Sequence, residues 1–177
     1  MVSVLLFGSE SASGRRPVSG DAVRTLSALV PGAVDGLIRD VQLLATAGET
    51  DLAAVADHAG CGFLTAGLAE ALRSAAADAR SPQMLLLLSG LSFDRALTDE
   101  MAGMATRHPS WLVQGVGLKA AEGGPLGRML PRFAPTIGIL TTREQVAATA
   151  PASVPALWRA LRPRHAFRTR AWSGGRD

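Results

Sequence analysis

The most constraining feature of this chain is a run of four leucines, Leu85–Leu88, that ends at Ser89 and Gly90. A run that is apolar at every position is typical of a central strand in a parallel sheet, because helices cover both faces of such a strand. Ligands of open α/β sheets bind beyond the carboxyl ends of the strands. We therefore expect Ser89 and Gly90 to line the working cleft. No carboxylate stands at that strand end to hold a metal.

Segments with strand-like and helix-like patterns alternate along the first part of the chain. We expect strands at 2–7, 37–45, 62–65 and 84–88, and helices at 21–30, 51–59, 68–80 and 92–107. Such alternation implies right-handed crossovers between parallel strands. The expected fold class is α/β, with a Rossmann-like, mostly parallel sheet covered by helices on both faces in three layers.

The second part of the chain is less regular. It contains expected strands at 111–118 and 136–140, separated by a loop rich in glycine and proline. Thr142 and Gln145 have the spacing of a capping box, which predicts a helix that follows directly, and a last short helix is expected at 156–162.

Composition limits the class of protein. A chain of 177 residues with 47% apolar residues can bury a full core, and it has no apolar run of about 18 residues that could span a membrane. Val2–Phe7 is too short for a secretory signal, so a cytoplasmic protein is expected. Cys61 is the single cysteine, which excludes an internal disulfide and favours a small buried filler over a reactive thiol.

The positive charge is concentrated near the C-terminus. The formal net charge is only +3, but arginines crowd the last stretch of the chain. They are Arg159, Arg162, Arg164, Arg168, Arg170 and Arg176. This segment could contact phosphates, nucleic acid or the anionic inner face of a membrane, or it could simply be solvated. The segment contains no recognisable nucleic-acid module, so no specific nucleic-acid partner is expected.

Four sequence stretches resemble bacterial family 2 glycosyltransferases. They are AVRTLSALVPGAVDGLIRDV at 22–41, TDLAAVADHAGC at 50–61, SPQMLLLLSGLS at 81–92 and TIGILTTR at 136–143. Members of that family are inverting enzymes with the GT-A fold. The resemblance implies one domain over 1–177, with a nucleotide-sugar-binding half at 1–108. The acceptor half would then be 109–177 and would carry the basic tail.

The chain departs from that family at each acidic motif. The family's Pro-Thr-x-Asn-Glu turn after the first strand corresponds to Phe7–Ser11, and its aspartate after the second strand corresponds to Ala45. Its metal-binding aspartates fall at Leu88–Gly90, and the acidic pair that supplies the base falls at about Ser153 and Val154.

These departures would remove two catalytic contributions. A divalent ion held by carboxylates neutralises the leaving group, and a base within hydrogen-bond reach of the acceptor contributes roughly a hundred- to ten-thousandfold. We therefore expect little or no transferase activity, no cofactor, and a role as a binding or interaction module. The alternative is an active enzyme that holds Mn²⁺ or Mg²⁺ with Glu49, Asp51 and Asp94. Asp51 and Asp94 would equally stabilise the first turns of helices.

The candidate substrate-binding residues follow from the strand ends and from the resemblance. They are Gly8, Ser9, Glu10, Ala45, Glu49, Asp51, Ser89, Gly90 and Arg143. Glu10 belongs to a Gly/Ser loop that either presents backbone N–H groups to a phosphate, with Arg15 and Arg16 nearby, or is merely solvated. The expected partners are a nucleotide or nucleotide sugar, a second protein such as a genuine glycosyltransferase, and an anionic membrane surface. The sequence leaves the oligomeric state open.

Overall fold

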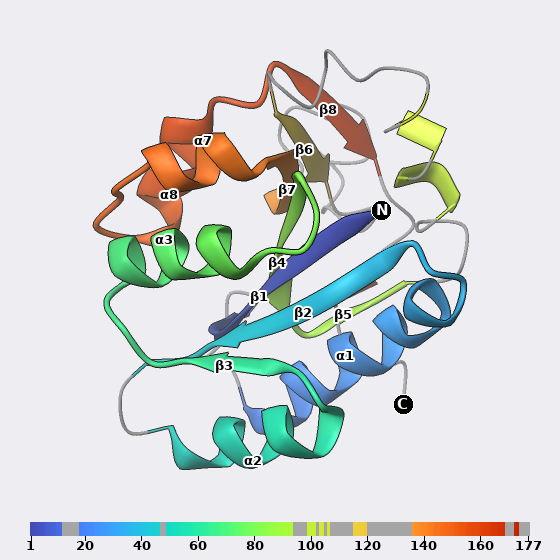
Figure 1. The fold of residues 1–177 in the computed structure, drawn as a ribbon, viewed down its shortest axis with the longest axis vertical. Coiled ribbons are helices and arrows are strands. Elements are labelled where there is room, and N and C mark those ends of the chain that lie inside the picture. Colours follow the sequence, from blue (N-terminus) through green and yellow to red (C-terminus); the bar gives the residue numbers. More distant parts are fainter. Residues whose placement is uncertain are drawn as a thin grey trace.

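A computed structural model describes residues 1–11, 18–46, 49–93, 99–101, 103, 104, 106, 115–119, 136–168 and 172–173. Its centre is a seven-stranded sheet in the order β3-β2-β1-β4-β7-β6-β8 (Figure 1). Strands β5 and β9 form a small second sheet. The strands are β1 Val2–Ser11, β2 Ile38–Leu44, β3 Gly62–Leu64, β4 Gln83–Ser89, β5 Leu91–Ser92, β6 Val116–Lys119, β7 Thr136–Thr142, β8 His165–Arg168 and β9 Trp172–Ser173. The helices described in full are α1 Ser19–Val34, α2 Thr50–Ala59, α3 Leu68–Asp78, α7 Arg143–Ala148 and α8 Val154–Leu161.

The large sheet is mostly parallel, as the sequence predicts. The pairs β1–β2, β1–β4, β2–β3 and β6–β8 are parallel. Strand β7 is antiparallel to both of its neighbours, β4 and β6. Its carboxyl end therefore lies at the opposite edge of the sheet from the carboxyl ends of β1, β2 and β4.

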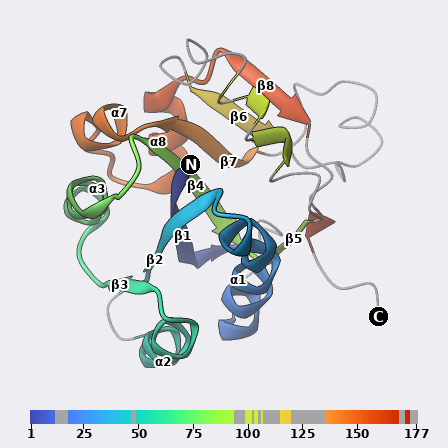
Figure 2. The ribbon, with the colours of Figure 1, turned by 45° about the vertical axis from the view of Figure 1, so that its right-hand side comes forward.

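Alternate residues of the central strands enter two separate cores. Val4 and Leu6 of β1 pack with α1 and α2, whereas Leu5 and Phe7 pack with α3, α7 and α8. The leucine strand β4 divides in the same way, and Figure 2 shows the two groups of helices on opposite sides of the sheet. The ring of Phe7 meets Trp158 of α8 edge to face, with centroids 5.8 Å apart. The predicted three-layer α/β arrangement is confirmed.

Helix α1 extends beyond the end that the sequence predicts. Pro31 was expected to stop it, but the helix continues to Val34 with the proline inside its last turn. The backbone N–H of Asp35 donates to the Pro31 carbonyl at 3.0 Å, so the final turn closes although the proline itself cannot donate. At the other end, the buried Asp21 carboxylate accepts from the backbone N–H of Val18 at 3.1 Å and fixes the start of the helix.

None of the helices in the described part of the chain has the length and apolar character needed to cross a bilayer. Two helix ends have clear local causes. Thr142 accepts from the backbone N–H of Gln145 at 3.4 Å, and α7 begins there. Gly60 ends α2 with a φ of +65°, a conformation that glycine adopts without a steric penalty.

Cys61 is half-buried between α2 and β3, and its Sγ lies 3.6 Å from the Ala56 carbonyl oxygen. Burial raises the pKa of the Cys61 thiol, so the thiolate fraction at pH 7 is smaller than for a free cysteine. We expect Cys61 to react with a disulfide reagent such as Ellman's reagent more slowly in the folded chain than in the urea-unfolded chain, by about tenfold or more. The rate should rise with pH well above neutrality. Equal rates in the two states at pH 7 would contradict this assignment.

Candidate functional site

The carboxyl ends of β1 and β2 open onto a hollow of about 410 Å³. Its walls are the two strand ends, the loop that leads into α3 and the start of α8. The lining residues are Phe7, Ser9, Glu10, Leu44, Ala45, Thr46, Thr65, Ala66, Gly67, Leu68, Ala152, Ser153 and Val154. This hollow lies where the rule for open α/β sheets places a ligand.

A hydrogen-bond network ties the two strand ends together. Ser9 Oγ donates to the Glu49 carboxylate, and the backbone N–H of Thr46 lies 2.7 Å from Ser9 Oγ and 3.2 Å from Glu49 Oε2. Glu49 stands directly before α2, and its own backbone N–H reaches the Thr46 carbonyl at 3.3 Å. The Glu49 carboxylate is therefore fixed by its bonds to Ser9 and Thr46, and these bonds hold the two strand ends together in this wall of the hollow.

Ser89 and Gly90 do not line the hollow, contrary to the expectation from the sequence. Ser89 is fully buried, and its hydroxyl donates to the Glu10 carbonyl at 2.8 Å, with the Gly8 carbonyl 3.5 Å away. Gly90 is buried, and its N–H donates to the Asp21 carbonyl at 3.1 Å. The cause is the length of β1, which continues past the expected end at Phe7 to Ser11, where it pairs with Ser89. The carboxyl end of β4 is therefore covered by the last residues of β1.

Arg143 does not join the other candidates either. Thr142 pairs with Gln83 at the amino end of β4, and the backbone N–H of Arg143 donates to the Pro82 carbonyl at 2.9 Å. Its guanidinium is exposed and lies 3.8 Å from the Glu144 carboxylate. Arg143 therefore lies at the far edge of the sheet because β7 runs antiparallel, and the sequence pattern gives no sign of strand direction.

The remaining candidates divide into two groups. Glu10 and Ala45 line the hollow, whereas Asp51 is exposed in the first turn of α2. Gly8 has a packing role, because a Cβ there would lie 2.8 Å from Leu52 Cδ1. The other members of the sequence hypothesis, Asp94, Arg15 and Arg16, fall outside the described residues.

Two wall segments carry residues that the candidate set does not contain. Ser153, which the resemblance placed at the catalytic-base position, caps α8 by accepting from the Ala156 N–H at 3.3 Å and lines the hollow. Thr65–Leu68 had no sequence motif to mark it. Only the strand order could have marked this segment as part of the site, because β3 ends at the same edge of the sheet as β1 and β2.

The side chains around the hollow do not fit a divalent metal ion. Mg²⁺, Mn²⁺ and Ca²⁺ prefer several carboxylate or carbonyl oxygens that converge on one point. The nearest acids are the exposed Glu10 and Glu49, which is already bonded to Ser9 and Thr46. The described part of the chain contains no group of three His, Cys, Asp or Glu side chains that could hold a metal ion.

The whole chain superimposes on solved glycosyltransferase structures. Glucosyl-3-phosphoglycerate synthase from Mycobacterium tuberculosis, in complex with Mg²⁺ and uridine diphosphate, matches with a TM-score of 0.67 and 14% identity, covering 100% of this chain and 72% of that one. The same enzyme with phosphoglyceric acid gives 0.65 and 15%, covering 100% and 73%. The chain has the GT-A fold.

A further match is the crystal structure of a mycobacterial protein, with a TM-score of 0.65 and 16% identity, covering 100% of this chain and 68% of that one. Neither a protein-family model nor a curated protein sequence matches the chain. At these identities the GT-A likeness establishes the fold and not the activity.

Proposed function

We propose that this chain is a nucleotide or nucleotide-sugar binding protein built on a glycosyltransferase fold, and that it transfers sugar slowly or not at all. The observation that carries the proposal is the contrast between the open ends of β1 and β2 and the covered end of β4. The ends of β1 and β2 open onto a hollow of about 410 Å³, whereas the end of β4 is covered and holds a buried serine and glycine. A base and ribose can be accommodated in such a hollow without a metal ion.

The polarity of the walls supports an anionic nucleotide. The amino ends of α3 and α8 both border the hollow, and the N-cap residue of α3 is Gly67, which offers no side chain to cap the first N–H groups. The partial positive charge at a helix N-terminus favours a phosphate. Apolar groups of Phe7, Leu44 and Leu68 in the same wall suit the face of a base.

Calorimetry with uridine and guanosine diphosphosugars, each with and without Mn²⁺, tests the proposal. We expect one of the nucleotides to bind with a dissociation constant of about 10 μM to 1 mM, which corresponds to about 4–7 kcal/mol. Because no set of described residues fits a cation, Mn²⁺ should change that constant by less than about threefold. Turnover of the activated sugar should stay at the level of spontaneous hydrolysis.

A second candidate is an active transferase that uses displaced acids. Glu49 favours it, because this carboxylate lies beside the hollow and contacts Ser9 and Thr46. That function requires binding that strengthens at least tenfold with Mn²⁺ together with release of free nucleotide, and Glu49→Gln should then abolish both. Absence of binding for every nucleotide tested would contradict both candidates.

The predicted contact with a membrane or a protein partner rests on the basic surface at the end of α8. Arg159, Arg162 and Arg164 are exposed there. Such a surface suits acidic headgroups or an acidic protein patch, and both partners remain predictions.

A further inference from the structure

The chain carries six arginines but no acidic residue between Glu144 and Asp177. Three of these arginines, Arg159, Arg162 and Arg164, are exposed where helix α8 ends and the chain turns toward β8. In the described part of the chain, no carboxylate lies within ion-pair distance of any of the three. Their positive charge is therefore not neutralised by a described side chain.

Two of these arginines border a shallow depression on the outer side of α8. It is lined by Ala156, Arg159, Ala160 and Arg162. The two alanines are one turn apart and bring no polar side-chain atom to the depression. Helix residues three positions apart have Cβ atoms about 5–6 Å from each other, so both guanidinium groups can reach one ligand that lies over the alanines.

The backbone of Arg162 has an unfavourable conformation. Its φ is +38° and its ψ is +60°, and among the described residues it is the only one other than glycine with a positive φ. A left-handed residue after the end of a helix is usually glycine, because a side chain makes this conformation costly. An arginine here lowers the stability of the fold, and such an outlier indicates that its side chain has a function.

We propose that Arg159, Arg162 and Arg164 form a binding site for a phosphate group. A guanidinium donates two parallel N–H groups, and this arrangement matches the spacing of phosphate oxygens. A phosphate monoester carries a charge of about −1.5 to −2 at pH 7 and three strong acceptor oxygens, so it can accept from two guanidinium groups at once. The phosphate belongs either to a soluble compound or to the headgroup of a membrane lipid, since both present the same oxygens.

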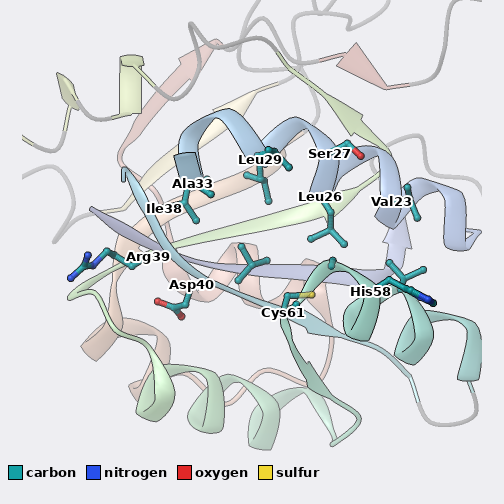
Figure 3. A pocket seen from close by; sticks show the side chains of 15 residues that line it. Val23, Leu26, Ser27, Leu29, Ala33, Ile38, Arg39, Asp40, His58 and Cys61 are labelled. Atoms are coloured by element: carbon teal, nitrogen blue, oxygen red, sulfur yellow. The ribbon is translucent and has the colours of Figure 1, made fainter. Parts of the chain in front are cut away.

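The larger groove between α1 and α2 does not offer a comparable anion site. Figure 3 shows Arg39 and Asp40 at one end of this groove and His58 at the other, with apolar side chains such as Leu26 between them. The Asp40 carboxylate accepts from Ser3 Oγ at 2.6 Å. A carboxylate is therefore held at the same end of the groove as the one arginine in its lining.

The arginine site is separate from the hollow at the ends of β1 and β2. Val154, the first residue of α8, lines that hollow, whereas Arg162 follows the last residue of the helix. Eight helical residues rise by about 12 Å, so a phosphate group beside Arg162 leaves the hollow free. The inference goes beyond the proposed function, and it holds whether or not a nucleotide binds.

Nuclear magnetic resonance of the isotope-labelled chain, titrated with inorganic pyrophosphate, tests the site directly. We expect saturable shifts of the backbone amides of Ala160, Arg162 and Arg164, with a dissociation constant of about 0.1–2 mM at low ionic strength. Because the arginines are exposed, added salt should weaken this binding. The absence of saturable shifts at these amides would overturn the proposal. Shifts confined to Gly67 and its neighbours would also overturn it, but they would support phosphate binding in the hollow.

Arg162→Gly separates binding from folding. The variant should bind pyrophosphate at least about fivefold more weakly, whereas its midpoint of thermal unfolding should be unchanged or higher, because glycine relieves the left-handed backbone. Arg159→Gln should also weaken binding. Arg73→Gln is the matched control, since it removes an exposed arginine from α3 and should leave the dissociation constant unchanged. An Arg162→Gly chain that binds as tightly as the wild type would contradict the proposal.

Flotation with lipid vesicles identifies the source of the phosphate. One set of vesicles contains only phosphatidylcholine, and the other also contains phosphatidic acid. Flotation that requires phosphatidic acid and is lost in Arg162→Gly would assign the site to lipid headgroups. Any other flotation result, combined with pyrophosphate binding that depends on Arg162, would assign the site to a soluble phosphate compound.

Discussion

Replacing Gly138 with alanine is expected to lower the free energy of unfolding by about 3 kcal/mol. Gly138 lies in β7 and pairs with Leu87 of β4, and a Cβ there would be 2.6 Å from the Leu86 carbonyl oxygen and 2.7 Å from Leu87 Cδ2. The first of these atoms belongs to the backbone of the central strand and cannot rotate away, so overpacking must shift the strand. For a chain of this length, the midpoint of thermal unfolding should fall by about 6–12 °C.

The sign of that effect is informative, because alanine in a strand is ordinarily more favourable than glycine by roughly 0.5–1 kcal/mol. Gly117→Ala in the neighbouring strand β6 is the matched control. Its Cβ would meet the ring of Pro163 at 3.3 Å, a contact with a side chain that can adjust, so the loss should stay below about 1 kcal/mol. Calorimetric unfolding of both variants measures the difference. A Gly138→Ala protein as stable as the wild type would contradict the close approach of β4 and β7.

Ala66→Trp is expected to weaken nucleotide binding at least 30-fold. Ala66 is half-buried in the wall of the hollow between β3 and α3. An indole at this position would occupy much of the roughly 410 Å³ in which we place the base and ribose. Because the hollow is open to solvent, the added ring needs no rearrangement of the two cores. Titration of the variant with the nucleotide that the wild type binds gives the dissociation constant.

Ala147→Trp provides the control for this prediction. Ala147 is exposed on α7 and does not belong to the lining of the hollow, so its replacement should change the dissociation constant by less than about twofold. Circular dichroism and the midpoint of thermal unfolding verify that both variants fold. If Ala66→Trp binds nucleotide as tightly as the wild type, the ligand occupies another part of the molecule.

The first half of the fold could be predicted from local patterns. Four consecutive leucines marked the strand that became β4, and the alternating helix and strand signals up to that point match α1, β2, α2, β3 and α3 in order. These elements are local, and parallel neighbours in a sheet follow from the crossover rule. The N-terminal cap at Thr142 was also correct, because its side chain makes the bond.

The site was harder to predict because it depends on where strands end and in which direction they run. Glycine and serine after Phe7 suggested a loop, but the chain continues as a strand because the Ser89 hydroxyl and the backbone of β4 provide partners. The resemblance to family 2 glycosyltransferases placed Arg143 near the phosphates or the acceptor, with a helix cap or a solvent-exposed position as the alternatives. Only the pairing with β4 shows that the strand before Arg143 is antiparallel and delivers the side chain elsewhere. Both differences depend on pairing between distant segments, which no short window of sequence contains.

The covered end of β4 also makes a carboxylate at position 89 unfavourable as a metal ligand. The Ser89 hydroxyl is a proton donor between two carbonyl oxygens, those of Gly8 and Glu10. An ionised aspartate at that position would have no proton to donate. Its negative charge would be repelled by both carbonyl oxygens. A cation ligand at position 89 would first require the last residues of β1 to detach from β4. A metal site there would therefore need at least two changes. The first change would lower the stability of the fold before any catalytic benefit appeared.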